Sequence, residues 1–281
     1  MATRKTAAKA STSTALTLWE EEMASAAVAQ AAVEKPSGFT SSISIRGGVM
    51  MIDKNKVKDN NVDVVILASV HENQWYTGPF DPDTIQTPDC YAIGKEEEGM
   101  APHADSADVQ GDENHQCANC EHNKMGSADT GRGKACKNVR RIAVVSADAL
   151  ESVEKFEQAE IRTFKVSVTS VRNYAKYVRG KLADEIKRPT YGVVTNIAVE
   201  PHQKYQFETL FSFVELVDFT QELYAAVKKR AAEAEKTLLE SSYPKMTEQP
   251  VAMPTNGRAA KYKKQPEAAP AAKTTRSRRA A

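Results

Sequence analysis

The 281-residue chain lacks the long apolar run that a membrane-spanning helix needs. No stretch of eighteen or more apolar residues occurs, and the longest candidate, 23–33, is short and rich in alanine. The basic residues near the N-terminus are followed by glutamates and by no apolar core, which argues against a secretory signal. The sequence therefore predicts no membrane contact and a cytoplasmic location.

The chain also lacks a strong net charge and the short motifs of common enzyme classes. Because 38 Lys+Arg stand against 37 Asp+Glu, a histone-like polycation is excluded. No nucleophile elbow, paired-histidine zinc motif or dinucleotide fingerprint is present. The glycine-rich segment 131–134 fails as a phosphate loop, since Ala128 and Ala135 replace its first glycine and its hydroxyl residue. We therefore predict a protein that is not an enzyme.

Cysteine is scarce, and its placement is informative. All four cysteines lie in one spacing, C-x26-C-x2-C-x15-C, formed by Cys90, Cys117, Cys120 and Cys136. A C-x2-C pair lets two thiolates reach one ion, and four thiolates close a tetrahedral shell without an open catalytic position. The spacing predicts a structural Zn²⁺ site, in which His115 or His122 could replace one cysteine. Free thiols or two disulfides are the alternatives without metal.

Composition divides the chain into segments. Residues 1–37 are rich in Ala, Ser, Thr and Lys and are predicted to be a flexible N-terminal arm. Residues 38–217 form the predicted nucleic-acid-binding domain, with the zinc insertion at 78–138. A C-terminal helix is expected over 218–240. The segment 241–281 carries 9 Lys+Arg against 2 Glu, which predicts a disordered basic tail with sequence-independent affinity for phosphates. A solubilising tail is the alternative.

Hydrophobic periodicity predicts a mainly β (α+β) fold. Five extended runs are expected near 43–45, 62–70, 141–146, 191–199 and 205–217, with a helix over 171–182. The helix falls between strands 3 and 4, and the zinc insertion falls between strands 2 and 3. This is the element order of the OB-fold, a five-stranded antiparallel barrel that commonly binds single-stranded nucleic acid.

Several side chains are candidates for nucleic-acid contact. Basic residues gather around the last cysteine and the strand that follows it: Arg132, Lys134, Lys137, Arg140 and Arg141. Trp75 and Tyr76 follow a strand at a polar boundary, where aromatic rings can stack on bases. Arg172 and Lys176 lie one helical turn apart, away from the apolar face of the predicted helix. For this helix pair, a solvated face is the alternative.

The combination of motifs resembles a known family. The motifs are Ser44-Ile-Arg46-Gly-Gly, Val64-Val-Ile-Leu67, Glu72-Asn73-Gln-Trp-Tyr76, Pro88-Asp-Cys90, Cys117-x2-Cys120 and Gly131-x-Gly-Lys-Ala-Cys136-Lys-Asn-Val-Arg-Arg141. Over about residues 40 to 217 the chain resembles the single-stranded DNA-binding proteins of tailed bacteriophages, including the zinc-containing helix-destabilising type.

The resemblance implies an OB-fold with a zinc subdomain that coats single-stranded DNA in replication, recombination and repair. It implies host-cell cytoplasm as the location and replication or recombination proteins as partners. The metal role falls on the four cysteines, and the DNA role falls on basic and aromatic residues of the sheet, Arg46 included. Proteins of this class commonly end in an acidic tail, whereas this chain ends basic.

Two other functions fit the sequence. A structural or adaptor protein that binds other proteins is suggested by the acidic insertion, where 12 Asp+Glu stand against 5 Lys+Arg, and by the long termini. A zinc-dependent nuclease would require metal-dependent cleavage. The oligomeric state is not determined by the sequence.

Overall fold

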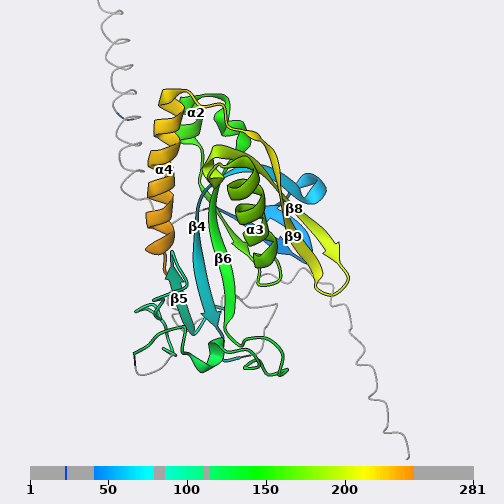
Figure 1. Cartoon of the computed structure of the whole chain (residues 1–281), viewed down its shortest axis with the longest axis vertical. Coiled ribbons are helices and arrows are strands. Elements are labelled where there is room, and N and C mark those ends of the chain that lie inside the picture. The colour runs from blue at the N-terminus through cyan, green and yellow to red at the C-terminus, as the bar shows by residue number, and fades with distance from the viewer. Residues whose placement is uncertain (1–22, 24–40, 79–85, 111–113, 244–281) are drawn as a thin grey trace, which may run out of the picture.

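The computed structural model describes residues 23, 41–78, 86–110 and 114–243, which form a mainly β structure with few helices (Figure 1). The strands are β1 (Ser41–Arg46), β2 (Val49–Ile52), β3 (Asn55–Lys56), β4 (Asn61–Trp75), β5 (Cys90–Gly94), β6 (Lys137–Ser146), β7 (Arg162–Val166), β8 (Val193–His202) and β9 (Gln206–Leu216). The α-helices are α2 (Val153–Gln158), α3 (Val171–Lys176) and α4 (Gln221–Leu239), and α3 continues into the π-helical segment η4 (Tyr177–Ile186). Short 3-10 turns occur at η1 (Lys58–Asn60), η2 (Glu121–Asn123), η3 (Ala147–Glu151) and η5 (Thr190–Gly192).

The strands join in one curled, mixed sheet. Eight of them run in the order β3-β2-β1-β7-β6-β4-β8-β9, and β5 pairs with β4 outside this path. The β1–β7 pair is parallel and the other pairs are antiparallel. The sheet curls into a half-barrel, and Gly48 in the turn after β1 lies close to Phe207 of β9.

The long strand β4 has two different partners along one edge. Its first residues pair with β8, and its last five, His71–Trp75, pair with β5. A β-bulge at Leu67 interrupts the register with β6, and Leu67 and Ala68 both join the same core. A bulge increases local twist and bends the strand. It thereby separates the half of β4 in the barrel from the half that carries the cysteine insertion.

Each face of the sheet carries its own core. The α4 face, which α4 covers in Figure 1, packs Val65, Val145, Phe156, Val227 and Leu238. The α3 face packs Ile66, Ile142, Phe164, Val166 and Tyr174. Adjacent residues of one strand enter opposite cores because side chains alternate across a strand. Because of this alternation, neighbouring basic residues of β6 lie on opposite faces of the sheet.

The C-terminal helix was predicted over 218–240, and α4 confirms it. Thr220 caps its start by accepting a hydrogen bond from the Leu223 N–H at 3.1 Å. Leu223, Val227 and Leu238 are buried at helical spacing against the sheet. The apolar stripe and the cap are both readable in the sequence.

The mainly β class with a curled sheet is confirmed, but the predicted strand count and the all-antiparallel sheet are wrong. The structure has nine strands instead of five. The helix at 171–182 follows the unpredicted strand β7, so an additional strand separates it from β6. The unpredicted β2, β3, β5 and β7 have two to five residues each. Segments this short contain too few residues for an alternating hydrophobic pattern to predict a strand.

The predicted terminal segments are only partly described. The N-terminal arm, 1–37, lies outside the described residues except for Met23. Residues 244–281 of the basic tail also lie outside them. The first residues of that tail, Ser241 and Tyr243, are described and contact the sheet. Among the described residues no helix is both long and apolar enough to cross a membrane.

Candidate functional site

The four cysteines, distant in sequence, meet at the end of the sheet. Cys90 begins β5, Cys117 and Cys120 precede η2, and Cys136 immediately precedes β6. All four are free, and together they border one small cavity of about 20 Å³. The β4–β5 pairing and the return of the chain into β6 bring them there. The fold thus gathers all four cysteines around one cavity.

Burial disfavours the ionised form of three of these thiols. It raises the pKa of Cys90 and Cys117, and it raises that of Cys136 to about 12, with the neighbouring thiols adding to each shift. These three thiols are therefore neutral at pH 7 unless a cation offsets the cost of ionising them. Bound zinc does this, because it deprotonates the thiols that coordinate it.

Cysteine is a residue type that binds zinc, and all four cysteines border one cavity. In the described part of the chain, however, no three or more His, Cys, Asp or Glu side chains are arranged as a metal-binding group. Of the two candidate histidine ligands, His122 borders the thiol cavity and His115 does not. Zinc at Cys90, Cys117, Cys120 and Cys136 stays a prediction.

A larger hollow opens beside the thiol cavity, where β4 ends. Trp75 and Tyr76 line it together with His122 and Lys137, and its volume is about 610 Å³. The rings of Trp75 and His122 stack at 4.4 Å between centroids, 24° from parallel. We call this site the aromatic hollow. It combines flat aromatic rings, on which a base can stack, with a lysine, which can contact a phosphate.

The glycine turn before β6 sets the basic residues in place. Gly131 and Gly133 have φ of +67° and +84°, which favours glycine, and the Gly126 N–H donates to the Gly133 carbonyl at 2.7 Å. Arg132 is exposed on this turn. Lys134 Nζ donates to Asn123 Oδ1 at 3.0 Å, and Lys137 borders the hollow. The turn borders the hollow through Ser127, Ala128 and Ala135, whereas Arg132 and Lys134 are not among the described residues that line it.

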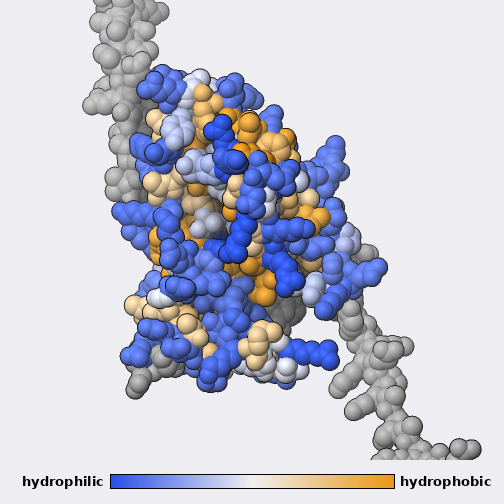
Figure 2. Space-filling model, viewed as in Figure 1, coloured by the Kyte–Doolittle hydropathy of each residue, from blue (hydrophilic) through white to orange (hydrophobic). Residues whose placement is uncertain are grey.

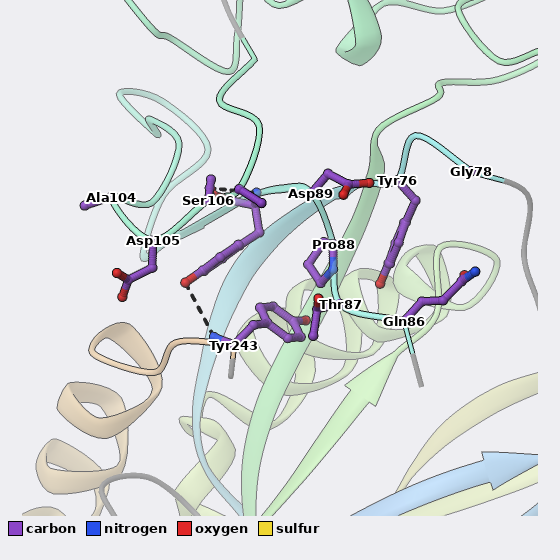
Figure 3. Close-up of a pocket in the computed structure, with 12 residues that line it drawn as sticks. Tyr76, Gly78, Gln86, Thr87, Pro88, Asp89, Ala104, Asp105, Ser106 and Tyr243 are labelled. Atoms are coloured by element: carbon purple, nitrogen blue, oxygen red, sulfur yellow. Dashed lines mark hydrogen bonds between the residues drawn. The ribbon is translucent and has the colours of Figure 1, made fainter. Parts of the chain in front are cut away.

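A second cavity, of about 550 Å³, lies on the other side of Tyr76. Figure 3 shows Pro88 and Thr87 between Tyr76 and Tyr243 in this cavity, with Asp89 and Asp105 also on its wall. Burial raises the pKa of Tyr76 to about 12, and the charges of Glu72 and Asp89 add to the shift. Asp129 also lies on the wall of the aromatic hollow, but Lys137 lines that hollow too, whereas the described wall of the second cavity has two carboxylates and no lysine or arginine. Carboxylates repel phosphate, so the aromatic hollow is the better candidate for a nucleotide.

Arg141 faces away from the hollow, into a buried network on the α4 face. Its guanidinium donates to both oxygens of Glu72, at 3.0 and 2.5 Å, and the Glu72 side chain is 0% exposed. The Tyr243 hydroxyl also donates to Glu72, and Lys165 Nζ donates to the Tyr243 oxygen at 2.8 Å. Because its charge is already neutralised, we leave Arg141 out of the proposed interface.

The remaining basic candidates are spread over the α3 side and the rim of the sheet. Arg46 is exposed at the end of β1, and Arg172 and Lys176 are exposed on α3. None of these three is among the described residues that line the hollow. Arg140 is half-buried on the α3 face, where Ile142 follows it into the core.

Sequence reasoning missed two members of this region. His122 was weighed only as a metal ligand, and its stacking on Trp75 joins residues 47 positions apart in the sequence. Tyr243 was assigned to the tail, although its ring contacts Tyr91 edge-on at 4.9 Å. An isolated aromatic residue just after a predicted helix was the available signal for Tyr243.

Comparison with known proteins adds no relative. The chain matches no protein-family model, and no curated protein or solved structure matches it.

Proposed function

We propose that this chain is a single-stranded DNA-binding protein that coats and protects single-stranded DNA in phage replication, recombination and repair. The curled sheet serves as an OB-fold-like platform, with a structural zinc at the four cysteines. The observation that carries the proposal is the aromatic hollow, in which Trp75, Tyr76 and His122 lie with Lys137 at the end of β4. Base stacking and phosphate charge are the sequence-tolerant contacts of single-strand binding.

The site also suits a single strand better than a duplex. In a duplex the bases are stacked on each other and their faces are not available to protein rings. An aromatic hollow therefore gains its stacking contacts only from an unpaired strand. Lys137 on its wall, together with Arg132 and Lys134 on the glycine turn that borders it, would add affinity that does not depend on base identity and that falls with salt.

The proposal is tested by fluorescence anisotropy of labelled oligo-dT and of a duplex of equal length, at two salt concentrations. We expect a strong preference for the single strand and weaker binding at higher salt. Equal, weak binding to both forms would contradict the proposal and leave only general electrostatic attraction. Stoichiometric co-purification of a protein partner, with no nucleic acid retained, would instead favour an adaptor.

Substitution of Trp75 tests the hollow itself. Trp75→Ala is expected to lower affinity for oligo-dT roughly 5- to 150-fold, because stacking contributes about 1–3 kcal/mol per base. Trp75→Phe keeps a ring and should retain most of the affinity. The matched control is Tyr224→Ala. Tyr224 is an aromatic residue of α4 that is 43% exposed, and it is not among the described residues that line the hollow.

Thermal unfolding of each Trp75 variant separates lost contacts from lost structure. A folded Trp75→Ala protein with wild-type affinity would remove the hollow from the interface. A Tyr224→Ala protein that is equally impaired would show that the loss is not specific to the hollow.

A further inference from the structure

Gln110 joins the cysteine cluster to the aromatic hollow through two separate contacts. Its backbone N–H donates to Cys90 Sγ at 3.4 Å. Its side-chain Oε1 lies 3.1 Å from His122 Nε2, at the edge of the ring that stacks on Trp75. All four residues line the thiol cavity, and His122 and Trp75 also line the hollow. Gln110 therefore contacts both a candidate zinc ligand and a ring of the hollow.

The loop that ends at Gln110 is attached to β5 and to the residue before it. The His103 N–H donates to the Tyr91 carbonyl at 2.7 Å. Further along the loop, the Asp108 N–H donates to the Asp89 carbonyl at 2.8 Å. An anchored segment thus presents the amide of Gln110 to the imidazole, so this amide can fix the orientation of the ring.

The backbone of His122 is held as well, which leaves its ring as the part that can rotate. Its carbonyl accepts hydrogen bonds from the Cys136 N–H at 2.8 Å and from the Ser127 hydroxyl at 2.9 Å. These bonds restrain the backbone but not the side-chain torsions, which can occupy several staggered positions. The contact with Gln110 at the ring edge and the stack on Trp75 at the ring face select one of them.

The hydrogen bond also defines the role of one ring nitrogen. An amide oxygen can only accept, so His122 Nε2 donates to Gln110 Oε1. A nitrogen that carries this hydrogen has no lone pair for a metal ion. In this arrangement His122 Nε2 serves to orient a stacking ring and is not a zinc ligand.

Few apolar contacts are present to hold the two rings without this hydrogen bond. The buried apolar cluster described in the insertion consists of Ala92, Met100 and Cys117, and neither ring belongs to it. Figure 2 shows mainly hydrophilic side chains at the lower end of the molecule, beneath β5 in Figure 1. Close packing is what fixes side chains in an apolar core. A ring outside such a core depends on its polar partner for its orientation.

We propose that Gln110 is a positioning residue for single-strand binding, which holds the His122 ring against Trp75 in the plane where a base can continue the stack. The inference rests on the proposed function and adds a residue that acts through His122 without touching the strand. Because the same residue is bonded to Cys90, it also makes the geometry of the hollow depend on the cysteine cluster.

The test replaces Gln110 with methionine, which has a similar length and no amide oxygen. Gln110→Met should bind oligo-dT about fivefold more weakly than wild type in anisotropy titrations, the effect of one hydrogen bond. The matched control is Gln203→Met. Gln203 is exposed in the turn between β8 and β9, and it is not among the described residues that line the hollow or the thiol cavity. This control should leave the affinity unchanged.

The near-ultraviolet circular dichroism of Trp75 reports the orientation of the rings directly. The chain has two tryptophans, so Trp19→Phe leaves Trp75 as the only one. In this background Gln110→Met should weaken the Trp75 band, because a ring that rotates loses its fixed asymmetric surroundings. Gln110→Glu keeps an acceptor oxygen at the same place and should retain the band. Metal content and melting temperature should stay at their wild-type values in both variants, because no cysteine is changed.

The other outcomes each contradict the inference. Lower affinity with an unchanged Trp75 band would mean that Gln110 contacts the strand itself. A weakened band with wild-type affinity would mean that the orientation of the rings does not matter for binding, and no change in either would mean that Gln110 does not hold them. A weakened band accompanied by loss of metal or by a lower melting temperature would show a structural role.

Failure of the proposed function gives a different result. In each outcome that contradicts only the inference, the wild-type protein still prefers oligo-dT to the duplex, so the proposed function stands. If the wild-type protein itself shows no such preference, the proposed function and the role of Gln110 in it are both overturned.

Discussion

Cys117→Ser is expected to release one zinc ion per chain and to unfold the cysteine insertion. Cys117 is buried in the same cavity as the other three thiols, inside a segment with few other buried apolar residues. In small zinc domains metal binding supplies roughly 10–16 kcal/mol, which becomes folding free energy. The stability lost with the ion should therefore far exceed the stability lost by exchanging one sulfur atom for oxygen.

The measurements are elemental analysis of purified protein and thermal unfolding with and without a chelator. The wild-type protein should contain one zinc, lose stability on chelation and recover when zinc is restored. Affinity for oligo-dT should fall in parallel, because the insertion supplies His122 and Lys137 to the aromatic hollow. Wild-type protein that purifies without metal, with a melting temperature unaffected by chelator, would contradict the prediction.

Glu72→Gln is expected to lower the free energy of unfolding by about 3–5 kcal/mol. The substitution leaves Arg141 and Lys165 without their common carboxylate, and the Arg141 side chain is only 12% exposed. Removing one partner of a buried pair is costly because the remaining charge stays desolvated. Urea denaturation at pH 7 measures the effect. The matched control is Glu235→Gln, since Glu235 pairs with Lys95 at the surface and should contribute less than about 1 kcal/mol.

The double variant Glu72→Leu with Arg141→Leu distinguishes this mechanism from a general packing defect. Both charges are then removed, so it should be less destabilised than Glu72→Leu alone. Equal or additive destabilisation would show that the charges are not coupled.

The same network sets a pH dependence of stability. Burial raises the pKa of Glu72, but the charges of Lys165 and Arg141 and the hydrogen bonds from Arg141 and Tyr243 outweigh it and hold the pKa below its usual value. A depressed folded-state pKa stabilises the protein above the unfolded value, about 4.3 for glutamate. This stabilisation is lost as pH falls through the folded-state pKa. Denaturation at successive pH values below 5 should show the loss in wild type and not in Glu72→Gln.

The location of Tyr243 links this network to the C-terminal tail. Its hydroxyl contacts Glu72, and its backbone N–H donates to the Tyr91 hydroxyl at 3.4 Å. Tyr91 follows Cys90 in β5. The segment after α4 is therefore attached to β5, the strand that carries the first cysteine of the insertion.

The sequence by itself determined the features that depend on neighbours along the chain. The alternation over 62–70 lies in β4, and the apolar stripe after Thr220 forms α4. The cysteine spacing indicated a single cluster, and the four thiols share a cavity. Periodicity and short spacings are local properties, so they can be read from one segment.

Tertiary structure alone decided which partners those segments meet. Strand register pairs Arg141 with Glu72, 69 positions away, and leaves Arg140 half-buried on the opposite face of the sheet. The short strands β5 and β7 have only five residues each, and they are held by pairing with longer strands. The Trp75–His122 stack likewise depends on the return of the cysteine insertion to β4. Such contacts depend on the three-dimensional path of the backbone, because no local periodicity encodes the register between distant segments.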